Sequence, residues 1–173
     1  MSRLFGPMRQ IGFVVDDFDK AMNHWLNVCS VGPWFYFERS AFKTFVYNGK
    51  NYNDIHISVA FANSGDVQLE LICQRCNTPS MYQEFLAAGH EGMQHWSSWP
   101  ENYDELYHRA LKNGYTVCQE GTHARGPFVY FRNEGHPGTV IEMSELTPGR
   151  RNFFDKVRTA AIDWDGRDPI RRM

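Results

Sequence analysis

The sequence lacks a long hydrophobic run, a signal peptide and an excess of charge of either sign. No apolar stretch approaches the ~18 residues that a transmembrane helix requires. The 18 basic and 20 acidic residues give a formal net charge of −2. Because this balance provides no broad basic surface, it argues against nucleic-acid and anionic-membrane partners. We therefore expect a soluble, cytoplasmic protein.

Cysteine is also scarce. Four cysteines in 173 residues are too few for a disulfide scaffold. The pair Cys73-x-x-Cys76 would need a second pair of ligands to form a zinc site, and no such pair follows at a suitable spacing. We expect reduced thiols. Aromatic residues, in contrast, make up 15% of the chain, and we expect some of them to line a pocket.

The chain contains an internal repeat. Gln10 lies in an apolar run, and a helix is predicted to begin eight residues later at Phe18. His95 lies in a similar run, and a second helix is predicted to begin eight residues later at Tyr103. Both helices place apolar residues at i, i+3, i+4, i+7 and i+8, which gives each one apolar face. The two halves therefore match at a spacing of 85 residues.

Each half also ends in an apolar strand with a central glutamate, Glu70 in the first and Glu142 in the second. A duplicated unit should bring Gln10 and Glu70 to face His95 and Glu142. One amide, one imidazole and two carboxylates at such a centre predict a divalent-metal site. The alternatives are an exposed Gln10, a hydrogen-bonded core His95, and glutamates that point outward from a one-sided sheet.

The predicted unit is a strand, a helix and three strands, present twice. This pattern resembles the vicinal oxygen chelate superfamily, in its glyoxalase I and methylmalonyl-CoA epimerase-like branch. The resemblance rests on the first strand and helix start (Gln10–Asp17), the start of the second unit (Gly92–Trp96) and the two closing strands (Glu70-Leu71 and Glu142-Met143). The resemblance covers roughly residues 8 to 146.

The resemblance implies an α+β fold in which two βαβββ modules form curved mixed sheets around a central metal site. The expected modules span 8–73 and 93–146, with a linker at 74–92 and a C-terminal helical extension at 147–173. A short helix is expected in the linker around Ser80 to Ala88, and the strands before the first closing strand include Phe42–Tyr47 and Ile55–Phe61.

The ligand set Gln10, Glu70, His95 and Glu142 suits Zn²⁺, Ni²⁺, Co²⁺, Mn²⁺ or Mg²⁺ without redox cycling. Such an ion polarises a substrate carbonyl, and Glu70 and Glu142 are candidate bases on its two sides. The chain is therefore expected to be a metal-dependent isomerase, epimerase or lyase. Its substrate is a small carbonyl compound, and the aromatic stretch Trp34–Phe37 suggests that it is hydrophobic or aromatic.

Two alternatives remain. A binding protein of the same fold could sequester an aromatic molecule without catalysis. A ring-cleaving oxygenase is disfavoured because Gln10 replaces the first histidine of that branch. Glutathione recognition is doubtful, since the positions that hold arginines in glyoxalase I carry Val14 and Glu91, and no basic cluster matches the phosphates of coenzyme A.

Other polar residues receive weaker predictions. His56 could reach the pocket as a second acid/base group, but a histidine that faces solvent or lies behind the site is favoured. His136 could gate the site, but a plain turn residue is favoured. Arg39 and Arg125 are expected to be surface charges that could flank the mouth of a pocket. The tail carries a helical apolar face that must be covered by the body of the protein or by another subunit. We expect a homodimer. The residues of this face are Phe153, Phe154, Val157, Ala160, Ala161 and Trp164.

Overall fold

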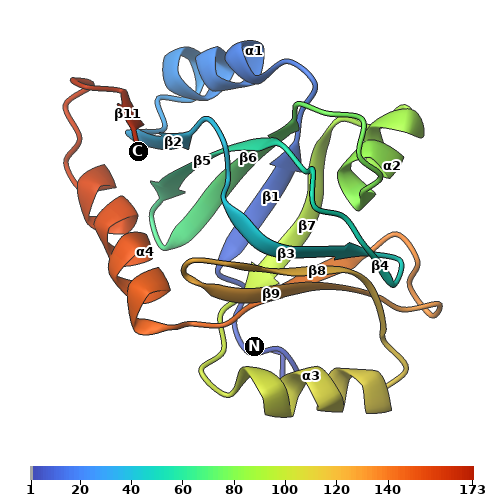
Figure 1. The fold of residues 1–173 in the computed structure, drawn as a ribbon. Helices are drawn as coiled ribbons and strands as arrows, with labels where there is room; N and C mark the ends of the chain where they lie inside the picture. Colours follow the sequence, from blue (N-terminus) through green and yellow to red (C-terminus); the bar gives the residue numbers. More distant parts are fainter. Residues whose placement is uncertain (1) are drawn as a thin grey trace.

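The computed structural model describes residues 2–173 (Figure 1). It has an α+β fold with four α-helices and one mixed sheet. Within residues 2–173, no helix combines the length and the apolar character needed to cross a bilayer. The elements are β1 (Gln10–Val14), α1 (Phe18–Asn23) with a π-helical continuation (His24–Val28), β2 (Trp34–Phe37), β3 (Phe42–Tyr47), β4 (Lys50–Asn51), β5 (Ile57–Ser64), β6 (Val67–Gln74), α2 (Met81–Ala87), β7 (Gly92–Ser98), α3 (Tyr103–Lys112), β8 (Thr116–His123), β9 (Gly126–Arg132), β10 (Val140–Ser144), α4 (Pro148–Ala161) and β11 (Ile170–Arg172).

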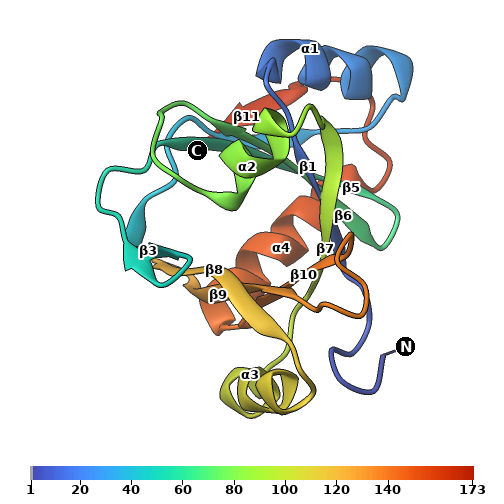
Figure 2. The same ribbon diagram turned by 90° about the vertical axis from the view of Figure 1, so that its right-hand side faces the viewer.

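The strands form one curved sheet in the order β11-β2-β5-β6-β1-β7-β10-β9-β8-β3-β4. The two halves of the chain meet where β1 pairs with β7 in antiparallel orientation. Helices α1 and α3 lie on the outer side of their own halves, as Figures 1 and 2 show. The second half has the expected order of strand, helix and three strands, whereas the first half has five strands after its helix because the β3–β4 hairpin is added. The two modules share a sheet instead of enclosing the site with separate ones.

The strand register follows the predicted repeat. Gly12 pairs with His95 and Gln10 pairs with Ser97 across the β1–β7 seam. Gly12 and Ser97 are 85 residues apart, as Gln10 and His95 are, so each residue of one pair has its equivalent in the other. The two pairs are therefore related by a pseudo-twofold. The closing strands obey the same relation, since Glu70 aligns with Gly12 and Glu142 with Ser97.

Side-chain alternation along these strands decides which residues face inward. Ile11 on β1 and Leu69 and Leu71 on β6 pack with the apolar face of α1. Ile141 and Met143 on β10 pack in the same way with α3. Since neighbours on a strand point to opposite faces, the glutamates between these residues are directed to the concave inner face.

The β3–β4 hairpin departs from a simple pair of modules. It belongs to the first half of the chain, but β3 pairs with β8 of the second half. Phe45 explains this position, because its fully buried ring packs in one cluster with Phe128 and Tyr130. The strand predicted at Ile55–Phe61 is shifted and runs from Ile57 to Ser64.

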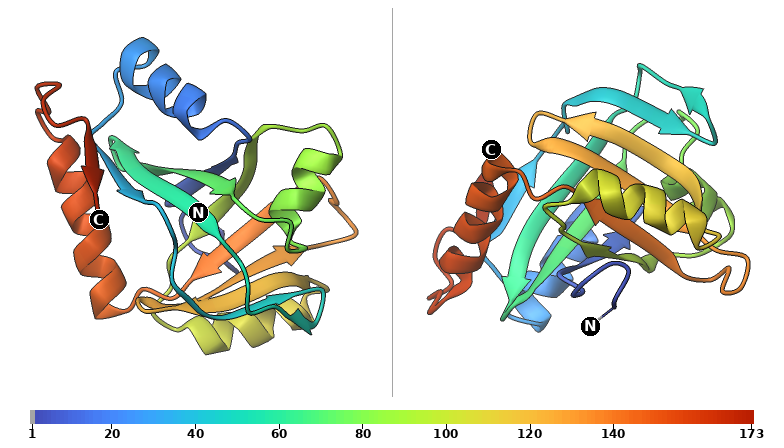
Figure 3. Two further views of the ribbon diagram at one scale, coloured as in Figure 1. Left: turned by 45° about the horizontal axis from the view of Figure 1, so that its top comes forward. Right: turned by 90° about the horizontal axis from the view of Figure 1, so that it is seen from below.

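The C-terminal segment closes one side of the molecule. Phe153, Phe154 and Val157 of α4 pack against Phe35, and the views in Figure 3 show α4 along the side of the sheet formed by β2 and β5. Strand β11 then pairs in parallel with β2. Trp164 lies beyond the end of the helix. The apolar face of the tail is therefore covered by the protein itself and does not by itself require a second subunit.

Candidate metal centre

Three of the four predicted ligands meet on the inner face of the sheet. His95 Nε2 lies 3.8 Å from Glu70 Oε2 and 3.6 Å from Glu142 Oε2. One ligand atom from each residue lies within 4.8 Å of the other two, and all three residues are buried. His95 Nε2 and Glu142 Oε2 have no hydrogen-bond partner among residues 2–173. Since buried polar atoms rarely stay unsatisfied, this donor set fits a divalent cation.

The orientation of His95 is fixed on several sides. Its Nδ1 lies 2.7 Å from Gln94 Oε1, and that oxygen only accepts, so Nδ1 carries the proton and Nε2 presents a lone pair. The ring of Tyr130 meets the imidazole edge-on at 4.9 Å. Gly12 leaves the space that the imidazole occupies, because a Cβ at that position would lie 1.9 Å from Cε1 of His95.

The two glutamates differ in their surroundings. Burial, together with the nearby carboxylate of Glu142, raises the pKa of Glu70 well above its ordinary value. Burial also acts on Glu142, but its neighbours His95, Ser97 and Ser144 outweigh it and lower the pKa of that carboxyl. Ser144 donates a hydrogen bond of 2.9 Å to Glu142 Oε1, which leaves Oε2 free to face His95.

The fourth predicted ligand, Gln10, lies in the wall of the same cavity. Its amide nitrogen donates a hydrogen bond of 2.8 Å to Gln68 Oε1. This bond holds the side chain in one orientation and leaves the amide oxygen as the atom available to a cation. Gln10 is buried, so the exposed alternative does not apply to it. Its role as a ligand stays a prediction.

The carboxylates lie in a cavity of about 190 Å³. A buried water molecule occupies on the order of 10–15 Å³ by the same measure, so the cavity has room for a small organic molecule. Its walls are mostly aromatic and aliphatic, as is typical of ligand sites. The phenylalanines in the walls are Phe37, Phe42, Phe61, Phe128, Phe153 and Phe154.

Polar residues in the cavity wall include two that the sequence did not point to, Arg150 and His123. Arg39, which is exposed, and Arg125 also line the cavity, in line with the expectation that they could flank its mouth. His123 packs against the rings of Phe42 and Phe128, with ring centroids 4.3 and 4.9 Å away. These residues have no counterpart in the repeat, so no spacing in the sequence pointed to them.

His56 and His136 lie outside the site. His56 Nε2 is 3.3 Å from the backbone oxygen of Glu38, and His136 contacts the hydroxyl of Thr139 in a turn. Neither residue lines the cavity. Both therefore have the structural roles that the sequence favoured.

Helix α2 closes the cavity opposite α4 through a pair of tyrosines. The hydroxyl groups of Tyr82 on α2 and Tyr130 on β9 lie 2.9 Å apart, and both side chains line the cavity. Burial raises the pKa of each phenol well above its ordinary value, so both keep their protons. Because one hydroxyl donates to the other, the accepting hydroxyl keeps a proton that it can donate elsewhere.

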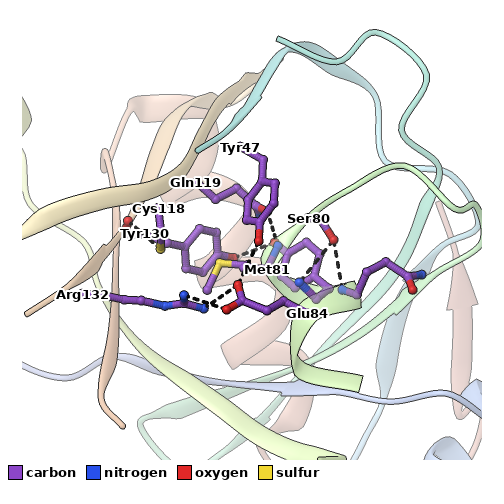
Figure 4. Close-up of polar contacts among 10 residues, drawn as sticks. Tyr47, Ser80, Met81, Glu84, Cys118, Gln119, Tyr130 and Arg132 are labelled. Carbon is purple, nitrogen blue, oxygen red and sulfur yellow. Dashed lines mark hydrogen bonds and ion pairs between the residues drawn. The ribbon is translucent and has the colours of Figure 1, made fainter. Parts of the chain in front are cut away.

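The position of Tyr82 is set by the contacts of α2 in Figure 4. The backbone N–H of Met81 donates to Gln119 Oε1 at 3.0 Å. Further along the helix, Glu84 accepts two hydrogen bonds of 3.1 Å from Arg132 and one of 2.9 Å from Tyr47. These contacts join the predicted linker to β3, β8 and β9.

The chain is similar to known proteins in sequence profile and in fold. The sequence profile described as the glyoxalase/bleomycin resistance protein/dioxygenase superfamily matches residues 9–131. No curated protein sequence matches the chain. Similar solved structures include methylmalonyl-CoA epimerase from Mycobacterium tuberculosis, at a TM-score of 0.61 and 15% identity, with 88% of this chain and 95% of that chain covered.

Two other solved structures are similar in fold. A hypothetical protein from Bacillus halodurans has a TM-score of 0.60 and 15% identity, with 80% of this chain and 93% of that chain covered. A variant of Streptomyces coelicolor methylmalonyl-CoA epimerase, in complex with 2-nitronate-propionyl-CoA, has a TM-score of 0.53 and 13% identity, with 80% and 93% covered. The resemblance of the sequence to the vicinal oxygen chelate superfamily is thereby confirmed.

Proposed function

This chain belongs to the glyoxalase/bleomycin resistance protein/dioxygenase superfamily, and on that premise we propose that it is a metal-dependent isomerase, epimerase or lyase. Its substrate would be a small, hydrophobic or aromatic carbonyl compound that loses a proton from the carbon next to the carbonyl. One observation carries the proposal. His95 Nε2 and Glu142 Oε2, both buried and without a hydrogen-bond partner among residues 2–173, face Glu70 beside an aromatic cavity that the two glutamates line.

Gln10, Glu70, His95 and Glu142 would hold the cation. This set of oxygen and imidazole donors suits Zn²⁺, Ni²⁺, Co²⁺, Mn²⁺ or Mg²⁺. When bound, such a cation supplies Lewis acidity that stabilises an enolate-like charge on the substrate oxygen.

The two glutamates provide for proton transfer. They occupy equivalent positions in the two halves, since Glu70 aligns with Gly12 and Glu142 with Ser97. A substrate between them would have one carboxylate on each side. One can accept the proton and the other can return it to the opposite face, or to a neighbouring atom in an isomerase. Ser144 donates a hydrogen bond to Glu142 Oε1 and so fixes the orientation of this carboxylate.

The aromatic walls contribute to both binding and exclusion of water. Phe153 and Phe154 on one side and Phe42 and Phe128 on the other give the cavity flat apolar surfaces. Such surfaces bind a ring-bearing ketone and leave little room for bulk water, which strengthens electrostatic interactions within the site.

Alpha-proton exchange tests the proposal most directly. The protein, loaded in turn with each candidate metal, would be incubated in D₂O with a panel of aryl ketones and thioesters, and deuterium uptake followed by ¹H NMR. We expect metal-dependent exchange with at least one compound. The Glu142→Gln and Glu70→Gln variants should slow the exchange by about 10²–10⁴-fold, the usual contribution of a general base, and the exposed Glu91→Gln variant should not.

The alternative function is non-catalytic sequestration of an aromatic molecule, which the aromatic cavity would also allow. Tight binding of panel compounds without exchange in any metal-loaded form would favour it over the enzyme. A homodimer and a cytoplasmic location stay predictions, which size-exclusion chromatography with light scattering and cell fractionation would test.

A further inference from the structure

The wall of the cavity contains a buried positive charge without an ion-pair partner. Arg150, in the first turn of α4, is only 4% exposed and lines the cavity. The ion pairs found among residues 2–173 do not include it. Arginine stays charged in proteins, and buried charges are normally paired. We therefore expect Arg150 to bind an anionic group.

Backbone carbonyl groups hold this guanidinium in place. It donates to the carbonyl oxygens of Gly126 at 3.0 Å, Pro127 at 2.9 Å and Glu145. Three of the five N–H groups that a guanidinium offers are used in this way, and two remain. Because the carbonyl groups are neutral, they orient the side chain without cancelling its charge.

The charge of the whole site supports the same conclusion, provided that the proposed function holds. Three guanidinium groups line the cavity against the two glutamates, and a bound divalent cation would add to this excess of positive charge. An anionic substrate would reduce the excess, whereas an uncharged ketone would not. Since uncompensated charge is costly in a buried site, the balance favours a substrate with an acidic group.

The surroundings of Arg150 indicate what that acidic group is attached to. Phe153 and Phe154 follow it on α4 and also line the cavity. A second guanidinium, that of Arg125, lies 4.4 Å from the ring centroid of Phe153 and 5.0 Å from that of Phe37. Aromatic faces and cationic groups thus lie together on this wall.

We propose that α4 supplies a carboxylate-binding subsite and that the substrate is an aryl compound with a carbonyl and a separate carboxylate. Arg150 binds the carboxylate, the phenylalanines of α4 contact the ring, and the carbonyl is directed toward Glu70, His95 and Glu142. The C-terminal extension, which lies outside the matched residues 9–131, therefore determines specificity.

Binding of a matched pair of probes tests the subsite without relying on catalysis. Isothermal titration would compare phenylacetate with phenylacetamide, its uncharged counterpart, on metal-free and metal-loaded protein. We expect the carboxylate to bind at least about tenfold more tightly in both forms, a difference of about 1.4 kcal/mol. The Arg150→Met variant should lose this preference. The Arg158→Met variant should keep it, since Arg158 lies on the same helix but is exposed and pairs with Asp66.

The metal-free form separates this proposal from the proposed function. Failure to bind metal would refute the function and leave the preference for phenylacetate intact. Equal binding of the two probes by wild type, or a preference that survives Arg150→Met, would overturn the subsite. If that variant does not fold, a crystal structure of wild type with 4-bromophenylacetate tests the subsite instead. The strong scattering of bromine would locate the ring of the probe. A carboxylate within hydrogen-bond distance of Arg150 supports the subsite, and one bound elsewhere overturns it.

Discussion

At the scale of single residues, the site depends on one glycine as much as on its ligands. Gly12 lies opposite His95 across the β1–β7 seam, and the imidazole occupies the space where a Cβ would be. Gln94 then fixes which nitrogen of the ring carries the proton. The lone pair of His95 therefore reaches Glu70 and Glu142 because three neighbours hold the ring, a supporting arrangement that is common around metal ligands.

Gly12→Ala should displace the imidazole and weaken metal binding. We expect affinity for Zn²⁺ or Co²⁺ to fall by about 10–100-fold, as when groups that orient metal ligands are removed, and stability to fall by about 1–3 kcal/mol from overpacking. Gly138→Ala is the matched control, because a Cβ there meets nothing within 4 Å. Competition titration with a chelator gives the affinities, and unchanged affinity in Gly12→Ala would refute this role.

His123 should make stability depend on pH. Burial lowers its pKa from 6.5 to about 4, so between these values the unfolded chain binds more protons than the folded one. The contribution of neutral His123 to the free energy of unfolding is therefore complete above about pH 6.5 and is lost as the pH falls toward 4, at up to about 1.4 kcal/mol per pH unit. Urea unfolding at pH 7.5, 6.0 and 5.0 should show a steeper loss in wild type than in His123→Phe, which keeps the stacked ring. Equal slopes would contradict the assignment.

At the scale of elements, α2 shows how a short helix is held in place. Ser80 is almost fully buried at its N-terminus. Its hydroxyl accepts from the N–H groups of Tyr82 and Gln83 and donates to Gln74 Oε1. Glu84 and Arg132 form a bidentate ion pair, but their side chains are 46% and 32% exposed. The buried cap should therefore stabilise the helix more than the exposed ion pair does.

The two contacts can be compared directly by mutation. Ser80→Ala should lower the free energy of unfolding by about 1–2 kcal/mol, because it removes the cap and leaves the buried Gln74 oxygen unpaired. Glu84→Gln should cost less than about 1 kcal/mol, since solvent screens an exposed pair. Urea titrations followed by circular dichroism would measure both. A larger loss in Glu84→Gln than in Ser80→Ala would reverse this ranking.

The elements that belong to the internal repeat could be predicted from the sequence. The 85-residue spacing of Gln10 and His95, the matching closing strands that carry Glu70 and Glu142, and the alternation of apolar residues predicted that these residues meet, since strand register and side-chain alternation are local rules. The β3–β4 hairpin was not predictable in this way. It pairs with β8 of the other half because Phe45 is buried there, and such packing between distant segments leaves no periodic signal.

At the scale of the whole molecule, the cavity belongs to both halves and to the tail. The candidate metal centre lies at the β1–β7 seam, where the pseudo-twofold relates Gln10 to His95 and Glu70 to Glu142. Helix α4, outside the repeat, adds Arg150 to the wall. Residues related by the duplication were therefore predictable from the sequence. Residues that depend on how the tail docks were not.

The central claim, a divalent-metal site at the seam between the halves, is tested most directly by the metal content of the purified protein. Wild type, His95→Ala and Glu142→Gln would be analysed by inductively coupled plasma mass spectrometry after equilibration with Ni²⁺, Co²⁺, Zn²⁺ or Mn²⁺ and desalting. We predict one equivalent in wild type and a marked loss in both variants. Wild type without metal, and without thermal stabilisation by any of these ions, would contradict the claim.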